Sequence, residues 1–390
     1  MTGIVAIPLM DAFSNGLALV LQADVLITIA ASALFGLFVG IVPGLSATMA
    51  VALLVPVTFS MSPVAALAAI ITCAAMSIFA GDIPGGYLRI PGTPASAAYT
   101  NDMADLVKQG RLGDSMGLSA FASVVGGIFG TVVLIFGAPL LAEVALNFSS
   151  FEYFWLALLG LSSATLVAGD DALKGVIALM VGLFLATVGL DFVTGVQRYT
   201  FGNMNLQAGI GLISVMIGAF ALAELFRRAV AFDITTPKLR IETKGKAWPS
   251  GRTLWEQKAH MARGGVLGTM LGVIPGAGAD IAAWVSYAIT KKFAREPKKF
   301  GHGSVEGVAG ASAANNASLS GSYVPTLVFG IPGDSITAIV VGVLILKGIQ
   351  PGPLVFVHSA DMVNALYIVF IVANLLLLPL GILAIYLGRA

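Results

Sequence analysis

Long apolar stretches alternate with short polar segments along the chain. Several of them reach the roughly 20 residues that a transmembrane helix needs. They cover 24–43, 62–80, 115–141, 151–169, 172–190, 205–226 and 362–388. Their apolar positions are continuous, whereas the strands of a membrane barrel alternate apolar and polar residues. The pattern therefore predicts an all-α polytopic integral membrane protein.

The composition agrees with a place in the lipid bilayer. Of the 390 residues, 57% are hydrophobic and 11% are charged, which is too little polar surface for a soluble domain of this length. A net charge of +1 gives no nucleic-acid footprint. The single cysteine, Cys73, excludes internal disulfides and a cysteine-based metal site, and we expect no cofactor beyond a coupling ion.

One sequence phrase occurs twice inside apolar stretches. Residues 36–46 read GLFVGIVPGLS and residues 268–278 read GTMLGVIPGAG, and a second Ile-Pro-Gly follows them at 90–92 and 331–333. Proline removes a backbone donor and glycine weakens a helix. Helix breaks at matched positions of two halves indicate a transporter binding site built from interrupted helices.

Lys and Arg residues orient the two copies, because loops rich in them stay cytoplasmic. Basic clusters within 227–263 and 291–299 flank the apolar segment 264–290. Pro275-Gly276 divides this segment into arms of about 11 and 14 residues, too short to cross the bilayer, so we expect a hairpin that enters from the cytoplasm and turns at mid-depth. No Lys or Arg precedes Arg89, which places the first copy's ends outside. Opposite orientations predict an inverted structural repeat with re-entrant hairpins.

The chain then divides into five parts. Residues 1–113 form the first repeat with tips at 43–48 and 91–96, 114–230 the scaffold transmembrane helices, 231–262 a cytoplasmic linker, 263–350 the second repeat with tips at 275–280 and 332–337, and 351–390 a C-terminal transmembrane helix. We expect the hairpins to move against the scaffold, by a rocking or an elevator motion.

A residue suited to start a helix lies at each break, namely Ser46, Thr93, Asp280 and Asp334. Helix N-termini at membrane depth present unpaired N–H groups and a partial positive charge, which attract carboxylates. A single Pro-Gly is more often an ordinary kink filled by neighbouring Ser and Thr. Four Pro-Gly pairs at matched positions of two similar halves favour a binding site.

Polar residues near the breaks complete the candidate site. The Arg89 guanidinium fits a carboxylate, but snorkelling to the headgroups or pairing with Asp82 explains this arginine equally well. Asn315 and Asn316 offer oxygens for a cation, with a helix–helix hydrogen bond as the alternative. The substrate-binding candidates are Gly44, Ser46, Arg89, Gly92, Thr93, Ser96, Gly276, Asn315, Asn316, Gly333 and Ser335. The candidates for the coupling ion are Thr48, Asp82, Asp280, Asn315 and Asp334.

Seven ordered motifs resemble the large membrane subunit, of the TctA type, of the tripartite tricarboxylate transporters. They are G-x-x-P-G-L at 40–45, R-I-P-G-T-P-A-S-A-A at 89–98, G-V-I-P-G-A-G at 272–278, F-G-H-G-S-V-E-G-V at 300–308, A-N-N-A at 314–317, F-G-I-P-G-D at 329–334 and K-G-I-Q-P-G-P at 347–353. The resemblance implies a multi-pass bacterial inner-membrane permease that imports citrate or another carboxylate with Na⁺ or H⁺. It also implies two partners, a small four-helix membrane subunit of the TctB type and a periplasmic solute-binding protein of the TctC type.

Two features depart from the family pattern. Arg89 stands where the resemblance leads us to expect Asn, which could mark a different anion. The chain ends at Ala390, whereas family members continue through further spans, so we expect a sequence truncated relative to the family.

Two other functions stay open on the sequence alone. Asp82 and Asp280 follow glycine-rich stretches and could serve an intramembrane aspartyl-type enzyme, although the sequence before Asp280 lacks the expected Gly-x-Gly-Asp. A passive anion channel is the other alternative, and it gives no reason for two broken hairpins.

Overall fold

The computed structural model divides the chain into two compact units. The described residues are 9–42, 45–167, 172–191, 196–210, 245–276 and 278–388, with the single residues 215, 218 and 226. The larger unit comprises residues 1–147 and 234–390, and the smaller unit comprises residues 148–233. Both are built almost entirely of helices where they are described, so the all-α fold class is confirmed.

The larger unit contains the same order of elements twice. The first half runs through α2 (Ala23–Ile41), α3 (Ala47–Thr58), α4 (Pro63–Ala80), α5 (Asp82–Leu88), η1 (Ser96–Ala98) and α6 (Thr100–Lys108). The second half runs through α12 (Gly251–Val273), α13 (Gly278–Lys292), η5 (Pro297–Lys299), α14 (Val305–Phe329) and α15 (Ser335–Leu346). In each half a helical hairpin is followed by a long inner helical segment, which is α4 with its continuation α5 in the first half and α14 in the second. An Ile-Pro-Gly follows the end of each segment. The inverted orientation of the two halves stays a prediction.

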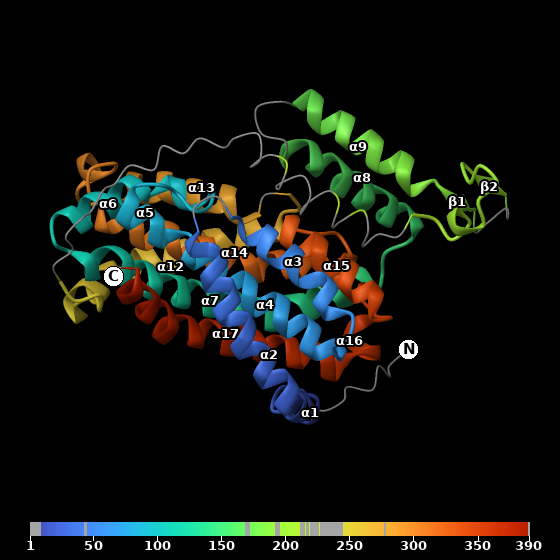
Figure 1. The fold of residues 1–390 in the computed structure, drawn as a ribbon, viewed down its shortest axis with the longest axis horizontal. Coiled ribbons are helices and arrows are strands. Elements are labelled where there is room, and N and C mark those ends of the chain that lie inside the picture. The colour runs from blue at the N-terminus through green and yellow to red at the C-terminus, as the bar shows by residue number, and fades with distance from the viewer. Residues whose placement is uncertain are drawn as a thin grey trace. The chain divides into compact units, whose positions relative to one another are not determined.

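Close packing between helix backbones joins each hairpin to its inner helix. A Cβ at Gly36 of α2 would lie 2.6 Å from the Cys73 carbonyl oxygen of α4, and one at Gly321 of α14 would lie 2.6 Å from the Thr269 oxygen of α12. Such approaches require glycine, because membrane helices attract mainly through van der Waals contact and small residues let their backbones meet. The helices α12, α14 and α7 (Leu118–Ala145) pack on one another, and Figure 1 shows them close together.

The two Ile-Pro-Gly breaks share one capping geometry. Arg89 ends α5 in the left-handed conformation with φ of 58°, and Gly330 ends α14 in the same conformation with φ of 69°. In both, the isoleucine amide that follows donates to the carbonyl of a proline six residues earlier. Glycine adopts this conformation freely, whereas other residues are strained in it. Arg89 therefore occupies a position that favours Gly or Asn.

Further helices surround the two halves. They are α1 (Leu9–Val20), η2 (Gly113–Gly117), α7, α16 (Val355–His358) and α17 (Ala360–Leu387). Four described helical segments are long and apolar enough to cross a membrane, namely Ala23–Ile41, Pro63–Leu88, Gly113–Ala145 and Ala360–Leu387. The helix α7, which we expected in the scaffold, packs on α14 within the larger unit.

The smaller unit is a helical hairpin with a short β-ribbon. Its helices α8 (Ser150–Val167) and α9 (Ala172–Ala186) pack on each other. The strands β1 (Gly189–Leu190) and β2 (Gln197–Arg198) pair antiparallel, and η3 (Met204–Leu206) follows them. Most of the predicted span 205–226 lies outside the described residues.

The second hairpin is longer than the apolar pattern predicted. The helix α12 begins at Gly251, inside the segment assigned to the cytoplasmic linker, because Ser250 accepts a hydrogen bond from the Thr253 amide and caps it. Its 23 residues give a helix of roughly 35 Å, long enough by length alone to cross a bilayer core. α13, with 15 residues, matches the short arm that we expected.

Candidate functional site

Side chains from the first hairpin and the second Ile-Pro-Gly break meet directly. The Ser46 hydroxyl accepts a hydrogen bond from the Met49 amide and caps α3, as predicted. Asp334 and Thr337 cap α15 reciprocally in a capping box. Between these two helix starts, the hydroxyl oxygens of Thr48 and Ser335 lie 2.9 Å apart, although 287 residues separate them in sequence. The two halves of the chain therefore touch at helix N-termini.

The second hairpin contacts both Ile-Pro-Gly breaks. At its tip, the Gly276 amide donates to the Gly333 carbonyl over 2.8 Å. Within α13, the Trp284 indole N–H donates to the Pro94 carbonyl over 3.1 Å. All four breaks thus converge, which the repeated motifs indicated but could not establish.

The first Ile-Pro-Gly break folds against the end of its own inner helix. The Gly92 amide donates to the Gly81 carbonyl over 3.0 Å. Thr93 and Ser96 exchange hydrogen bonds between side chain and backbone, and both are buried. These bonds satisfy the amides of the turn, so the hydroxyls serve the local fold first. Thr93 does not cap a helix as predicted, because η1 begins at Ser96 with Ala95 as its N-cap.

Asp280 does not start its helix. The helix α13 begins at Gly278, which places Asp280 in the first turn and leaves its side chain exposed. A carboxylate in a first helical turn interacts favourably with the helix dipole even without capping it. Asp280 and the capping residue Asp334 put acidic side chains at the second hairpin tip and the second break, which suits a cation better than an anion.

A buried polar network joins the two halves behind the breaks. Asp82 accepts hydrogen bonds from the Tyr99 hydroxyl over 2.7 Å and from the Ser119 hydroxyl. The Asn315 amide nitrogen donates to the same Tyr99 oxygen over 3.3 Å. The sequence singled out Asp82 and Asn315 but missed Tyr99 and Ser119, because neither lies in a break or in a repeated motif.

The neighbouring amide Asn316 is also buried, and neither its oxygen nor its nitrogen has a protein partner in the described structure. Adjacent helical residues diverge by about 100°, so Asn316 faces a different neighbour from Asn315. The sequence candidate Gly44 lies outside the described residues.

Arg89 is engaged away from the network. Its guanidinium pairs with Asp105 over 2.7 Å and donates to the Asn101 side chain over 3.1 Å, and 39% of the side chain is exposed. Asp105 and not Asp82 is therefore its acidic partner. An arginine held in this way ties α5 to α6 across the break.

Asp102 forms a second buried link between the halves that the sequence did not reveal. Its carboxylate accepts hydrogen bonds from the Gly303 and Ser304 amides, each over 2.9 Å, and from the Tyr287 hydroxyl over 2.5 Å. The loop before α14 is thereby fastened to α6. Nothing around Asp102 in sequence distinguishes it from a surface acid on a short helix.

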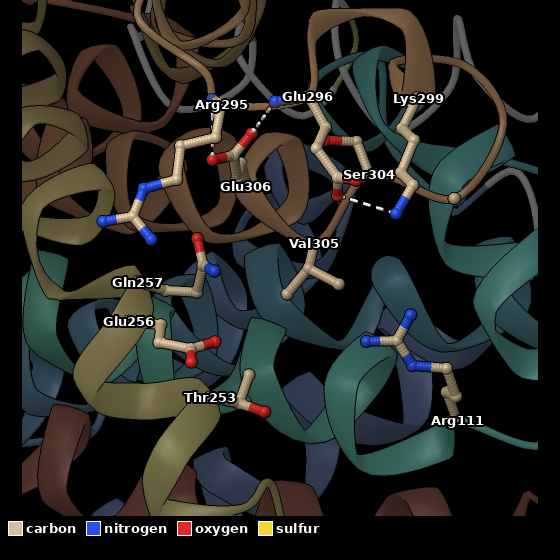
Figure 2. Close-up of a pocket in the computed structure, with 11 residues that line it drawn as sticks. Arg111, Thr253, Glu256, Gln257, Arg295, Glu296, Lys299, Ser304, Val305 and Glu306 are labelled. Atoms are coloured by element: carbon tan, nitrogen blue, oxygen red, sulfur yellow. Dashed lines mark hydrogen bonds and ion pairs between the residues drawn. The ribbon is translucent and has the colours of Figure 1, made fainter.

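A polar pocket of about 230 Å³ lies apart from the four breaks. Figure 2 shows it among Arg111, the first turns of α12, the η5 loop and the start of α14. Within it, Lys299 pairs with Glu296, and Glu306 accepts from the Arg295 and Glu296 amides. Arg111 pairs with Asp114 and Glu256 with Arg252, so most of these charges already have a partner in the fold, and the pocket does not replace the breaks as the candidate site.

Comparisons with known proteins agree with the motifs. The model of the family described as Tripartite tricarboxylate transporter TctA family matches residues 26–388. An uncharacterized 52.8 kDa protein of the TAR-I ttuC' 3' region of Agrobacterium vitis is 36% identical over 349 residues, which are 90% of this chain and 69% of that protein. An uncharacterized protein of the TAR-II ttuC' 3' region of the same organism is 41% identical over 115 residues, which are 30% of this chain and 48% of that protein. No solved structure matches. The chain therefore belongs to the tripartite tricarboxylate transporter TctA family, a family of transporters and not of enzymes.

Proposed function

We propose that the chain is the permease subunit of a secondary-active, binding-protein-dependent transporter. It imports a tricarboxylate or another carboxylate anion across the bacterial inner membrane, with Na⁺ or H⁺ as the coupling ion. The observation that carries this proposal is the convergence of the four helix breaks. The contacts between them are Thr48–Ser335, Gly276–Gly333 and Trp284–Pro94. Interrupted helices that meet in this way surround the substrate sites of inverted-repeat transporters.

The substrate carboxylates bind at the helix N-termini of the breaks. The backbone amide of Gly333 and the hydroxyls of Ser46, Thr93 and Ser335 supply the donors, with Asn315 and Asn316 behind them. The Gly92 and Gly276 amides and the Ser96 hydroxyl already donate within the fold and keep the turns in shape. Helix starts favour anions through their free N–H groups and dipoles. The groups that can hold the positive charge of a coupling ion are the acidic Asp82, Asp280 and Asp334, together with Thr48 and Asn315. Arg89 is left out of this set because Asp105 already neutralises it.

Alternating access follows if the two halves are inverted. Because each hairpin contacts the opposite half's break, movement of one half relative to the other exposes the junction to one side at a time. The small four-helix membrane subunit and the periplasmic solute-binding protein of the family are the expected partners, and the latter would deliver the anion from outside.

Counterflow in proteoliposomes tests the proposal. Purified permease with its membrane subunit, loaded with unlabelled citrate or a related carboxylate, is expected to accumulate the labelled anion transiently, since a carrier exchanges bound substrate across the membrane. Ser335→Ala should weaken the apparent affinity, whereas Ser60→Ala, which removes a hydroxyl bonded only to the Val57 carbonyl of the preceding turn, should not. Flux that does not saturate and shows no counterflow would support the passive anion channel and reject the carrier.

A further inference from the structure

The Asp82 carboxylate is buried in a membrane-spanning helix without a counter-charge. Its residue is 1% exposed and lies at the start of α5, inside the candidate span Pro63–Leu88. Among the described residues, Asp82 forms no ion pair with a Lys, Arg or His. A carboxylate in such a place either takes up a proton or binds a cation, because an isolated buried charge is too costly.

The titratable groups on the elements around α4 and α5 do not supply that cation. These groups are Asp11 of α1, Asp24 of α2, Cys73 of α4, Tyr87 and Arg89 at α5, Tyr99, Asp102, Asp105 and Lys108 at η1 and α6, Arg111 and Asp114 at η2, Glu143 of α7, Glu306 and Tyr323 of α14, Lys347 after α15, and Asp361, Tyr367 and Tyr386 of α17. Of these described groups, only the Tyr99 hydroxyl bonds Asp82. The basic members with a recorded partner bind groups other than Asp82: Arg89 pairs with Asp105, Arg111 pairs with Asp114, and Lys347 donates to backbone carbonyls after α3.

The geometry around Asp82 fits a proton better than a sodium ion. One carboxylate oxygen accepts from Tyr99 and the other from Ser119, both at hydrogen-bond distance. A metal cation would need those hydroxyls to turn their lone pairs toward it and several further oxygens around it.

Asn315 allows the network to carry either protonation state. With Asp82 ionised, the Asn315 amide N–H donates to the Tyr99 oxygen and the Tyr99 O–H donates to Asp82, which leaves the Asn315 side-chain oxygen without a partner. With Asp82 protonated, a half-turn of the amide reverses the chain: the Asp82 O–H donates to Tyr99, and Tyr99 donates to the Asn315 oxygen. An amide carries both a donor and an acceptor group and can therefore serve both arrangements.

We propose that Asp82 is the binding site of the coupling proton, and that Tyr99 and Asn315 relay its protonation state between the two halves. This inference rests on the proposed transport function and adds to it the identity of the ion. The proton that joins one Asp82 oxygen is released from the same oxygen, and the hydroxyl and amide groups only exchange the direction of their hydrogen bonds.

The place of Asp82 explains how its proton would be coupled to an anion. Gly81, the residue before it, accepts from the Gly92 amide, and a Cβ added at Gly81 would lie 2.7 Å from the Thr93 methyl carbon. The first substrate-binding break thus packs on the backbone next to the carboxylate. An ionised Asp82 repels a carboxylate bound there, whereas a protonated Asp82 does not, so substrate and proton should bind together.

Infrared spectroscopy of the purified protein tests proton binding without requiring transport. The wild type is expected to show a carbonyl band of a protonated carboxyl group that is lost as the pH rises, and Asp82→Asn is expected to abolish this band. Asp105→Asn, which removes the carboxylate paired with Arg89, should retain it. Tyr99→Phe keeps the ring but removes a donor to ionised Asp82, so the midpoint of the band's loss should move to higher pH. A band unchanged in both Asp82→Asn and Tyr99→Phe overturns the proposal.

Transport assays then separate this inference from the proposed function. In wild-type proteoliposomes, a proton gradient should drive accumulation of the labelled carboxylate. Asp82→Asn, which can neither take up nor release the proton, should lose gradient-driven accumulation, whereas Asp105→Asn should keep both counterflow and accumulation. If Asp82→Asn still accumulates substrate with the proton gradient, or loses only a response to Na⁺, the proton assignment is wrong while the carrier function stands. Absence of counterflow in the wild type contradicts the proposed function, and the infrared result still decides whether Asp82 binds a proton.

Discussion

The contact between α12 and α14 gives a prediction whose size can be worked from the structure. A methyl group added at Gly321 would lie 2.6 Å from the Thr269 carbonyl oxygen and 3.1 Å from its Cα. Non-bonded heavy atoms prefer separations of about 3.5 Å or more, so Gly321→Ala requires the two helices to move apart by about 0.9 Å. Packed helix interfaces resist such a movement, and overpacking of this kind costs about 1–3 kcal/mol.

Gly137 of α7 provides the matched control. A Cβ there would meet only a methyl carbon of Val133, 3.8 Å away on the same helix. Gly137→Ala should therefore leave the protein as stable as the wild type or stabilise it by up to about 1 kcal/mol, since alanine favours helix over glycine. The same chemical change thus has opposite expected signs at two positions in long helices.

The single cysteine makes the assay simple. Cys73 is free and fully buried, so a thiol-reactive dye reports the opening of the larger unit as the protein is heated. Gly321→Ala should lower the melting temperature by several degrees relative to both the wild type and Gly137→Ala. Equal melting temperatures for the two variants would show that α12 and α14 are not in backbone contact at Gly321.

Three further substitutions test individual interactions. Arg89→Asn relieves the strain of a left-handed backbone conformation and loses an exposed ion pair worth at most about 1 kcal/mol. Thermal stability should therefore be unchanged or higher, and counterflow should be retained. A large loss of substrate affinity would show that Arg89 belongs to the binding site. Asp102→Asn weakens charge-assisted bonds to the loop before α14, and a denaturation series should show a loss of about 1.5–3 kcal/mol, whereas an unchanged midpoint would contradict this link between the halves. Trp284→Phe removes the donor to Pro94 and should cost about 1 kcal/mol and alter the counterflow rate, and wild-type behaviour in both measurements would mean that this contact is dispensable.

The helices and their breaks were largely predictable from the sequence because the lipid environment permits few alternatives. Continuous apolar runs of sufficient length must form helices in a bilayer. Proline lacks the backbone N–H, and the bilayer core holds no water that could bond the carbonyl left without its donor. The caps at Ser46 and Asp334 followed from their residue types, whereas Thr93 and Asp280, predicted on the same basis, do not cap a helix. The start of α12 was missed because residues 251–263 are polar, and the pattern of apolar positions carries no signal for a helix there.

The partners of the charged residues could not be predicted. Arg89 and Asp82 are seven residues apart, yet they face different neighbours because the left-handed cap at Arg89 turns its side chain toward α6. Tyr99 and Ser119 reach Asp82 only after η1 and α7 have packed against α5, and aromatic or hydroxyl residues in apolar runs are too common to attract notice. Long-range pairs such as these depend on tertiary packing that spacing along one chain does not encode.

Crosslinking at the junction of the two halves tests the central claim most directly. In a Cys73→Ser background, Thr48→Cys and Ser335→Cys place two thiols where the native hydroxyl oxygens are 2.9 Å apart, within reach of a disulfide. Mild oxidation of the permease in membranes is expected to join them, as read by mass spectrometry of the linked peptides, while the pair Ser60→Cys and Ser335→Cys stays unlinked. If Thr48→Cys and Ser335→Cys remain free thiols that both react with a maleimide, the four breaks do not converge and the site built on them does not exist.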